Sequence, residues 1–224
     1  MKRLVLSCLL VLSPSARPAE PLAAVLAKLD TSAATFRGAT AKLTRIRHTA
    51  IINDDSQEHG TFRMLRSGRQ VTVLIEFGEP DPKTYFFRDR KGEIYYPKLA
   101  LVQEYDLGKY RTLVDQFLLL GFGSSGKDLA RGYTIQIAGE EKVGGAAAVH
   151  LQLTPKSAEV AEKLKLAELW ISPDGASTLQ QKFLERSGDY TLVRYADLKL
   201  NPDIPADSLR LNLPPGVKRE SPMK

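Results

Sequence analysis

Apolar and polar residues alternate with a period of two through most of the chain. The clearest example is the run in which Val71, Val73, Ile75 and Phe77 occupy every second position. Such alternation is typical of strands with one buried face. Roughly ten or more segments of this kind follow one another with few helical segments between them, and a sheet with so many strands curls. We therefore expect a mainly β protein built on a curled antiparallel sheet.

Glycine, proline, asparagine and aspartate mark the expected strand boundaries. We expect the first strand to run over residues 41–52, with a turn at residues 53–56, and the second to run over residues 60–65. A last strand is predicted at residues 209–213, where leucine occupies every second position. Neither an internal repeat nor a linker interrupts the pattern, so we expect one domain spanning residues 20–224.

One stretch, residues 110–126 (YRTLVDQFLLLGFGSSG), departs from the strand pattern. Its apolar residues Leu113, Phe117 and Leu120 recur at helical spacing, and the glycines that follow are typical of a helix end. We interpret it as an apolar helix packed on the sheet. It either seals the core or forms a movable lid over an apolar pocket, and spacing alone favours the core role. Other helices are expected over residues 21–37, 127–131 and 157–164.

Residues 1–19 have the parts of a secretory signal peptide. Two basic residues precede an apolar run that is too short to span a bilayer, and small residues interrupted by a proline follow. We expect export to the periplasm and a mature chain that begins between Ala16 and Pro21. The single cysteine, Cys8, lies inside this leader. Ordinary cleavage is favoured over lipidation of Cys8, because lipidation would leave almost no apolar run before the cut.

The charge of the chain does not indicate a nucleic-acid partner. The net charge is +6, but three basic residues lie in the leader, which leaves 29 basic and 26 acidic residues beyond it. These basic residues do not gather on any one predicted helix or loop, as they would in a nucleic-acid-binding face. We therefore expect no nucleic-acid partner.

The residue patterns of common enzyme sites are missing from the sequence. His48, His59 and His150 lie in separate strands or turns, without the spacing of metal ligands. The serines of residues 122–126 (FGSSG) lack the Gly-x-Ser-x-Gly spacing of a nucleophile elbow, and no glycine-rich phosphate loop joins a strand to a helix. We therefore expect neither an enzyme nor a bound metal or cofactor.

Four short strings, taken together, carry a resemblance to a known family. They are GTFRMLR at residues 60–66, DxxGxIYYP at residues 89–97, LxIxPDG at residues 169–175 and LxLxLPPGV at residues 209–217. In order and spacing the chain resembles the periplasmic lipoprotein-carrier family, LolA and its relatives, over nearly all of the expected mature length. The resemblance implies an incomplete, strongly curved antiparallel β-barrel whose concave face is covered by helices, with acyl chains held between them.

The same resemblance gives Arg66 a role. Members of the family usually carry an arginine at the end of the second strand, followed by a proline, that hydrogen-bonds to carbonyls of a lid helix. Arg66 stands at that position, with Ser67 in place of the proline. The resemblance implies that Arg66 is a lid latch, whereas a turn arginine beside Gly68 would ordinarily face water. The next segment is aliphatic where carriers are rich in aromatics, which fits a divergent member.

Strand alternation and the helical stripe together predict one shared apolar interior. The residues that we expect to line this lipid cavity are Phe62, Met64, Val73, Ile75, Phe77, Leu101, Phe117, Leu120 and Trp170. At Trp170 the choice of face is nearly even, because Leu169 and Ile171 compete for the same side.

The leading hypothesis is a soluble, monomeric periplasmic carrier that shields the acyl chains of a lipoprotein or another envelope lipid between the inner and outer membranes. An inner-membrane transporter as donor and an outer-membrane acceptor are the partners that this role implies. The alternative is a sensor or interaction module that uses the same fold to bind a protein without carrying lipid. A third reading, an enzyme that acts on lipids, lacks a candidate catalytic group.

Overall fold

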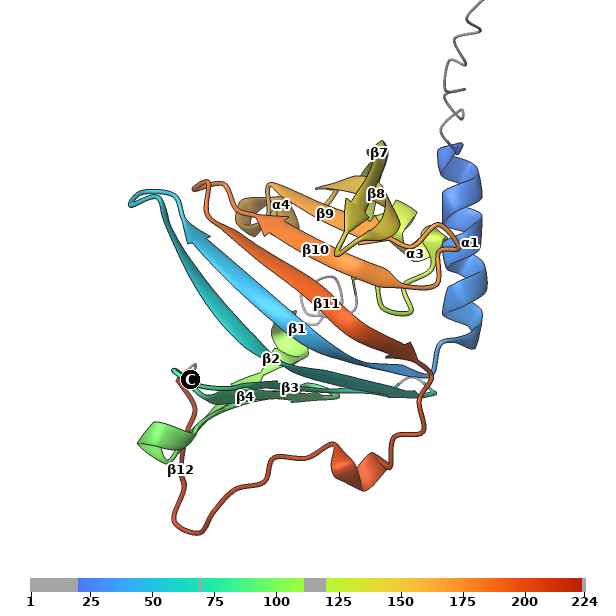
Figure 1. Ribbon diagram of the computed structural model, residues 1–224. Helices are drawn as coiled ribbons and strands as arrows, with labels where there is room; N and C mark the ends of the chain where they lie inside the picture. The colour runs from blue at the N-terminus through green and yellow to red at the C-terminus, as the bar shows by residue number, and fades with distance from the viewer. Residues whose placement is uncertain (1–19, 69, 111–119, 223–224) are drawn as a thin grey trace, which may run out of the picture.

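The computed structural model describes residues 20–68, 70–110 and 120–222 (Figure 1). Its main feature is one sheet of 12 strands in the order β12-β6-β5-β4-β3-β2-β1-β11-β10-β9-β8-β7. Neighbouring strands are antiparallel except β12 and β6, which are parallel. The strands are β1 (Gly38–Thr49), β2 (Asp54–Ser67), β3 (Gln70–Phe77), β4 (Lys83–Arg88), β5 (Lys91–Tyr96), β6 (Leu101–Asp106), β7 (Tyr133–Val143), β8 (Ala146–Pro155), β9 (Leu166–Ile171), β10 (Thr178–Leu184), β11 (Tyr190–Leu200) and β12 (Lys218–Glu220).

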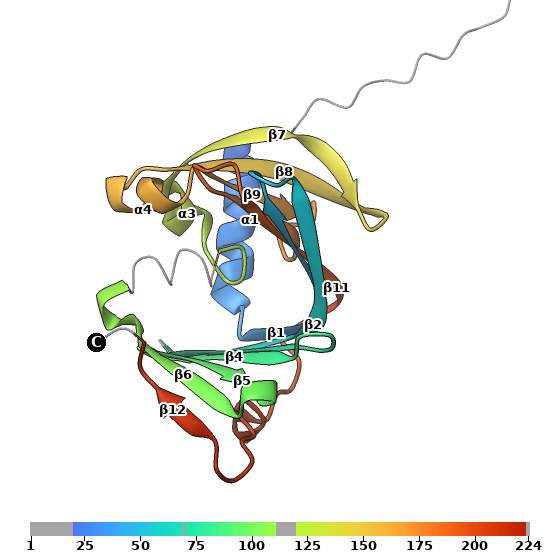
Figure 2. The ribbon, with the colours of Figure 1, turned by 90° about the vertical axis from the view of Figure 1, so that its left-hand side faces the viewer.

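The sheet is strongly curved, and its two end strands, β7 and β12, leave it open (Figure 2). Seen from the side, β7 and β8 arch above the concave face, β3 to β6 run below it, and α1 lies between them. Gly60 lets β2 and β3 approach closely, because a Cβ atom at this position would overlap the carbonyl oxygen of Glu76 on β3. The prediction of a mainly β, incomplete and curved antiparallel barrel with helices on its concave face is confirmed.

Three α-helices lie among the described residues, and each agrees with a predicted helix to within one or two residues at either end. They are α1 (Leu22–Thr35), α3 (Gly126–Gly132) and α4 (Ala158–Lys163). The α1 helix buries Val25 and Leu29, as its apolar stripe predicts. Within the described part of the chain, no helix has the length and apolar character needed to cross a membrane. Short 3-10 turns occur at Pro97–Leu99, Leu107–Tyr110 and Ala206–Ser208.

Most of the predicted apolar helix at residues 110–126 lies outside the described residues, Leu113 and Phe117 included. Its described end is a loop at residues 120–125, and α3 begins only at Gly126. Gly121 and Gly123 adopt positive φ angles of 83° and 65°, which glycine tolerates without strain. This observation agrees with glycines that stop a helix, while the helix itself stays a prediction.

The concave face carries two buried apolar clusters. The first joins the three helices to strands β7 to β10, and its members include Val25, Leu29, Leu120, Leu129, Leu151, Leu153, Val160, Leu169 and Ile171. The second covers β1 to β3 and reaches β4 and β11, and its buried members are Phe36, Ala39, Ala41, Leu43, Phe62, Met64, Val73, Phe77 and Phe122.

The predicted last strand at residues 209–213 is wrong. Leu209 is fully buried, but it packs against Leu74 and Phe86 on the convex face of the sheet. Its carbonyl oxygen accepts a 3.0 Å hydrogen bond from Arg88 Nη2. Prolines flank this segment and lack the N–H groups that a strand ladder needs, so side chains hold it in place. Figure 1 shows it passing beneath the sheet before the chain ends in β12.

The first turn begins three residues earlier than predicted. β1 ends at Thr49, residues 50–53 form the turn, and β2 begins at Asp54. Ile51 and Ile52, which were predicted to lie in a strand, therefore stand at the tip of the hairpin.

Candidate functional site

Five predicted cavity residues gather in the second cluster: Phe62, Met64, Val73, Ile75 and Phe77. Strand pairing explains this, because directly paired residues of antiparallel strands share a face. Phe62 pairs with Ile75, and Met64 pairs with Val73. Phe62, Met64 and Val73 are 3%, 0% and 1% exposed, whereas Ile75 is half-buried. The concave side of β2 and β3 therefore presents an apolar wall.

Aromatic rings that were not predicted complete this wall. The ring centre of Phe122 lies 5.0 Å from that of Phe62 and 4.9 Å from that of Tyr195. Phe122 belongs to the FGSSG string, which was considered only as a nucleophile motif and was rejected because its spacing does not fit. Tyr195 pairs with Leu43 of β1. It was not predicted, because the register of β11 shifts just after Tyr195 and the alternation of buried and exposed residues is interrupted there. Burial raises the pKa of Tyr195 well above its usual value.

Two further predicted cavity residues, Leu120 and Leu101, lie outside this cluster. Leu120 is buried in the first cluster, among side chains of α1 and β9. Leu101 is half-buried at the start of β6, pairs with Tyr96, and is not among the described members of the Phe62 cluster. Phe117 lies outside the described residues.

Trp170 corrects the prediction of a shared interior. It packs with Val143 and Ala148 in a separate cluster, while its neighbours Leu169 and Ile171 face the helices. The indole Nε1 donates a 2.8 Å hydrogen bond to Glu141 Oε2. On the helix-covered face the indole N–H would need a partner among apolar side chains, so the aliphatic neighbours occupy that side.

Three side chains of the sheet hold the loop at residues 120–125, which we call the anchored loop. Arg66 Nη2 donates a 3.1 Å hydrogen bond to the carbonyl oxygen of Gly123. Thr178 Oγ1 donates to the carbonyl oxygen of Gly121 at 2.5 Å, and Gln181 Nε2 donates to that of Leu120. Each bond satisfies a loop carbonyl that has no partner in a strand ladder.

Arg66, the predicted lid latch, therefore hydrogen-bonds to a backbone carbonyl of the anchored loop. Arg66 is half-buried, and its guanidinium carbon lies 5.4 Å from the ring centre of Phe36. Gln181 is braced in turn, because its Oε1 accepts a 2.8 Å hydrogen bond from the Tyr195 hydroxyl. Sequence reasoning missed Thr178 and Gln181, since polar residues on a strand are usually assigned to its solvent face.

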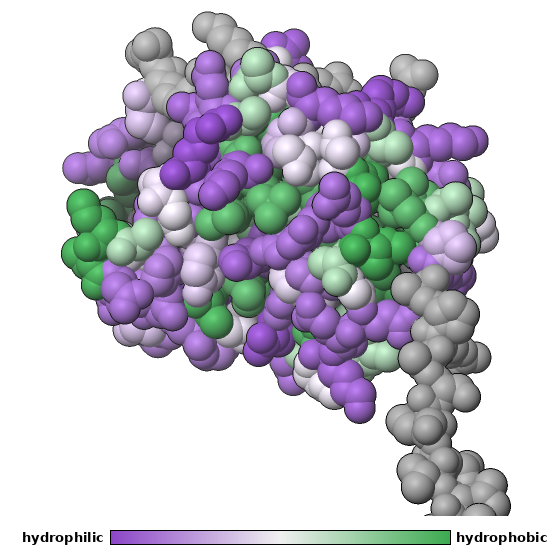
Figure 3. All heavy atoms as spheres, turned by 90° about the horizontal axis from the view of Figure 1, so that it is seen from above, coloured by the Kyte–Doolittle hydropathy of each residue, from purple (hydrophilic) through white to green (hydrophobic). Residues whose placement is uncertain are grey.

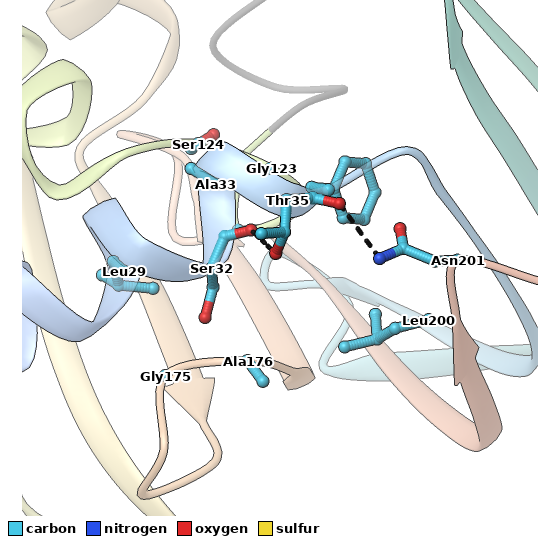
Figure 4. A pocket seen from close by; sticks show the side chains of 12 residues that line it. Leu29, Ser32, Ala33, Thr35, Gly123, Ser124, Gly175, Ala176, Leu200 and Asn201 are labelled. Atoms are coloured by element: carbon cyan, nitrogen blue, oxygen red, sulfur yellow. Dashed lines mark hydrogen bonds between the residues drawn. The ribbon is translucent and has the colours of Figure 1, made fainter.

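A small cavity lies beside the anchored loop, between the end of α1 and the turn that joins β9 to β10 (Figure 4). Its volume is about 60 Å³, enough for a few water molecules and far less than an acyl chain needs. Leu29, Ala176 and Leu200 are among its lining residues. Asn201 closes one side, where its Nδ2 donates a 3.0 Å hydrogen bond to the carbonyl oxygen of Thr35.

An ion cluster occupies the concave side beyond Phe77, with Lys83 buried, Arg45 and Glu58 half-buried and Asp81 exposed. Arg45 Nε donates a 2.8 Å hydrogen bond to Glu58 Oε2, and Lys83 Nζ lies 2.7 Å from Glu58 Oε1 and 2.7 Å from Asp81 Oδ2. The guanidinium of Arg45 also stacks 4.0 Å above the ring centre of Phe77. Burial acts to raise the pKa of Glu58, but the hydrogen bonds from Lys83 and Arg45 outweigh it and lower that pKa.

The three histidines take part in hydrogen bonds within the protein. His48 Nδ1 lies 2.8 Å from Asp55 Oδ1, His59 Nδ1 lies 3.1 Å from Thr44 Oγ1, and His150 is 2.8 Å from Glu141 and 3.1 Å from Glu168. The described residues include no group of three or more histidine, cysteine, aspartate or glutamate side chains arranged to hold a metal ion.

Comparison with known proteins bears on the fold. No protein-family model matches the chain, and no curated protein sequence matches it. Among solved structures, MucB is similar with a TM-score of 0.54 at 16% sequence identity, and the match covers 85% of this chain and 62% of the MucB chain. The chain thus spans less than two thirds of the length of MucB, a protein also solved in complex with MucA from Pseudomonas aeruginosa.

Two further structures match over nearly their whole length. An uncharacterized conserved protein from Thermus thermophilus has a TM-score of 0.54 at 11% identity, covering 89% of this chain and 98% of its own. The lipoprotein LppX from Mycobacterium tuberculosis has a TM-score of 0.50 at 12% identity, covering 83% and 99%. The chain has the LolA-like fold. At these identities the likeness concerns the LolA-like fold alone, and function must be argued from the residues.

Proposed function

We propose that this protein is a periplasmic carrier that shields the acyl chains of a lipoprotein or of another envelope lipid. The observation that carries the proposal is the apolar wall on the concave face, where Phe62, Met64 and Val73 of neighbouring strands point to one side. The signal-like residues 1–19 support export to the periplasm. An inner-membrane transporter as donor and an outer-membrane acceptor complete the proposed route.

The energetics of burial suit an acyl chain as the ligand. Each methylene group moved from water to an apolar surface gains about 0.8 kcal/mol, so a long chain binds with little polar recognition. The anchored loop stands beside this wall, because Phe122 of the loop contacts Phe62. Opening it breaks the hydrogen bonds from Arg66, Thr178 and Gln181, which gives a partner protein a defined set of contacts to compete with.

We propose that the protein binds its ligand without catalysing a reaction on it. The charged groups on the concave side, Arg45, Glu58 and Lys83, are engaged with one another. Groups committed to ion pairs with one another are poorly suited to act as a free nucleophile or base.

Mass spectrometry of organic extracts from gently purified protein tests the proposal. We expect an acyl lipid to be extracted, and we expect a fluorescent fatty-acid probe to bind and to be displaced by that lipid. Lipid-free extracts, from protein that also fails to bind the probe, contradict the carrier. That result favours the second candidate, a module that binds a protein partner as in the MucA/MucB complex.

Intact-mass measurement of protein from the cell envelope tests the export step. We expect a chain that begins between Ala16 and Pro21. A diacylglyceryl adduct on Cys8 would show that the signal belongs to the lipoprotein class instead.

A further inference from the structure

The tip of the β1–β2 hairpin exposes two adjacent isoleucines. Ile51 is 92% exposed and Ile52 is 68% exposed, and among the described residues only Leu99, at 66%, is a comparably exposed large apolar side chain. Four-residue turns usually carry glycine, asparagine, aspartate or serine, so two β-branched apolar residues are unusual here. Figure 3 shows a hydrophobic patch at the edge of the molecule where this hairpin tip lies.

The tip is braced on both sides. Asn53 N donates a 3.2 Å hydrogen bond to the carbonyl oxygen of Ala50, which closes the turn. Ala50 N donates a 2.7 Å hydrogen bond to Asp189 Oδ1, in the neighbouring turn between β10 and β11. The rings of His48 and Tyr190 stack below, with centres 4.7 Å apart. These contacts hold the backbone that carries Ile51 and Ile52 in a fixed position.

The charges around the tip are mainly acidic. Arg47 and Arg186 are its basic neighbours, whereas the acidic residues of the same two hairpins are Asp54, Asp55, Glu185 and Asp189. A surface with this charge offers no electrostatic attraction to an anionic lipid surface. Attachment through the tip would have to come from burial of the two isoleucines.

The size of the patch decides what kind of partner it fits. Two isoleucine side chains offer on the order of 200 Å² of apolar surface, whereas a stable protein interface buries about 800 Å² on each partner. A second copy of this chain or another folded protein would need much more matching surface. A lipid bilayer needs no matching shape, since apolar side chains partition individually into the acyl boundary.

The tip also stands at the end of the strands away from α1, where it projects from the body of the molecule (Figure 1). A projecting hairpin can meet a flat surface before the rest of the protein does. We propose that the β1–β2 hairpin tip is a membrane-contact site, which inserts Ile51 and Ile52 into the acyl boundary of a lipid bilayer. This contact is weak and reversible, and it is separate from the acyl-chain site on the concave face.

Vesicle binding of two variants tests the membrane-contact site. Ile51→Trp places a fluorescent reporter at the tip, and the only native tryptophan, Trp170, is 6% exposed and supplies a constant background. With phosphatidylcholine vesicles at millimolar lipid, we expect the emission of this variant to shift to the blue and to be quenched by brominated lipid. The double variant Ile51→Ser, Ile52→Ser should partition into vesicles about tenfold less for each isoleucine removed.

Matched measurements separate insertion of the tip from attraction by charge and from binding at the acyl-chain site. Leu99→Ser removes a comparably exposed leucine at a different site and should leave vesicle binding unchanged. Binding should persist in salt of about 0.5 M, where the screening length is roughly 4 Å, and should not require phosphatidylglycerol. Fatty-acid probe binding by the double variant should match that of the parent, so failure of the carrier proposal would be seen separately.

Three results would overturn the membrane-contact site. The first is an emission spectrum of the Ile51→Trp variant that does not change when vesicles are added, because an inserted indole must leave water. The second is vesicle binding by the double serine variant that equals that of the parent. The third is sedimentation that shows a dimer of the parent lost in the double variant, which would assign the tip to self-association.

Discussion

Arg66, near the end of β2, donates a 3.1 Å hydrogen bond to the carbonyl oxygen of Gly123, 57 residues further along the chain. The bond ties the edge of the apolar wall to the anchored loop, beside the ring of Phe36. An arginine suits this position because its planar guanidinium carries five donors and keeps its charge. Any motion that lifts the loop must break this contact.

Replacement of Arg66 by leucine should weaken the hold on the anchored loop and leave the fold intact. A hydrogen bond from a charged donor contributes about 1.5–3 kcal/mol, which can shift an equilibrium between closed and open loop states about tenfold or more. We expect the affinity or the retention time of a fluorescent fatty-acid probe to change, measured by titration and by stopped-flow displacement.

Arg47→Leu provides the control for Arg66→Leu, because Arg47 is an exposed arginine of β1. The other arginine of the predicted turn, Arg69, lies outside the described residues. The Arg47 variant should bind and release the probe as the parent does. If Arg66→Leu does the same, the latch role is contradicted.

Gly123→Ala should weaken the contact between Arg66 and the anchored loop by a change in the loop, whereas Arg66→Leu changes the sheet. A Cβ at this position would overlap Phe36 and would lie 2.9 Å from Arg66 Nη2, in a backbone with φ of 65°. Gly144→Ala is a matched control, because Gly144 has φ of 57° and a Cβ there would meet nothing within 4 Å. Both variants lose about 1 kcal/mol to the left-handed backbone. Urea unfolding should show a further loss of about 1–3 kcal/mol for Gly123→Ala alone. Equal losses would mean that Phe36 and Arg66 make room for the added methyl group at no cost, which contradicts a tightly held loop.

The sequence predicts the curved sheet well because alternation is a local property of each strand. Val73 and Met64 stand in regular strands, so counting every second residue finds their face. In β11 the same counting fails. Tyr195 and Leu198 both pack against the Phe62 cluster although they are three residues apart, because the register shifts there and Asp197 adopts a φ of 53°. A bulge of this kind exchanges the two faces of a strand and leaves no periodic signal.

The anchored loop was predictable only in part for a different reason. The resemblance to a known family pointed to Arg66, but the partners Thr178 and Gln181 depend on which strands lie beside the loop after folding. Polar residues within a strand indicate solvent unless the tertiary structure brings them a carbonyl. The alternation at residues 209–213 led to a wrong prediction of a strand. Leu209 is buried because it packs on the convex face, although its segment pairs with no described strand.

Leu209→Ala should destabilise the protein by about 2–5 kcal/mol, as expected for a buried leucine whose site cannot collapse. Leu209 is 0% exposed and covers Leu74 and Phe86. A loss of this size would show that the segment around Leu209 is stably packed on the convex face. Leu99→Ala, at an exposed leucine, should change the free energy of unfolding by no more than about 0.5 kcal/mol. A loss of the same small size for Leu209→Ala would show that the segment docks only loosely.

The ion cluster around Glu58 predicts a pH dependence that Glu58→Gln should remove. The Glu58 side chain is 14% exposed, and its pKa lies below the usual 4.5 because the hydrogen bonds from Lys83 and Arg45 outweigh the effect of burial. A carboxylate with a lowered pKa in the folded state stabilises the protein fully above its unfolded pKa, and this contribution is lost as the pH falls through the folded value. At pH 7 the variant should be less stable by about 1–3 kcal/mol, since it leaves Lys83 and the half-buried Arg45 short of their shared carboxylate.

The difference in free energy of unfolding between parent and Glu58→Gln should therefore be largest near neutral pH and should shrink as the pH falls below 4.5, the usual value of the carboxyl. Glu79→Gln is the control, because Glu79 is 76% exposed in its pair with Lys98 and should give a difference near zero at every pH. Urea titrations from acidic to neutral pH measure both series. A Glu58→Gln difference that stays constant across this range would mean that the carboxylate charge does not stabilise the fold, and that the cluster is held by packing around Arg45 and Phe77 instead.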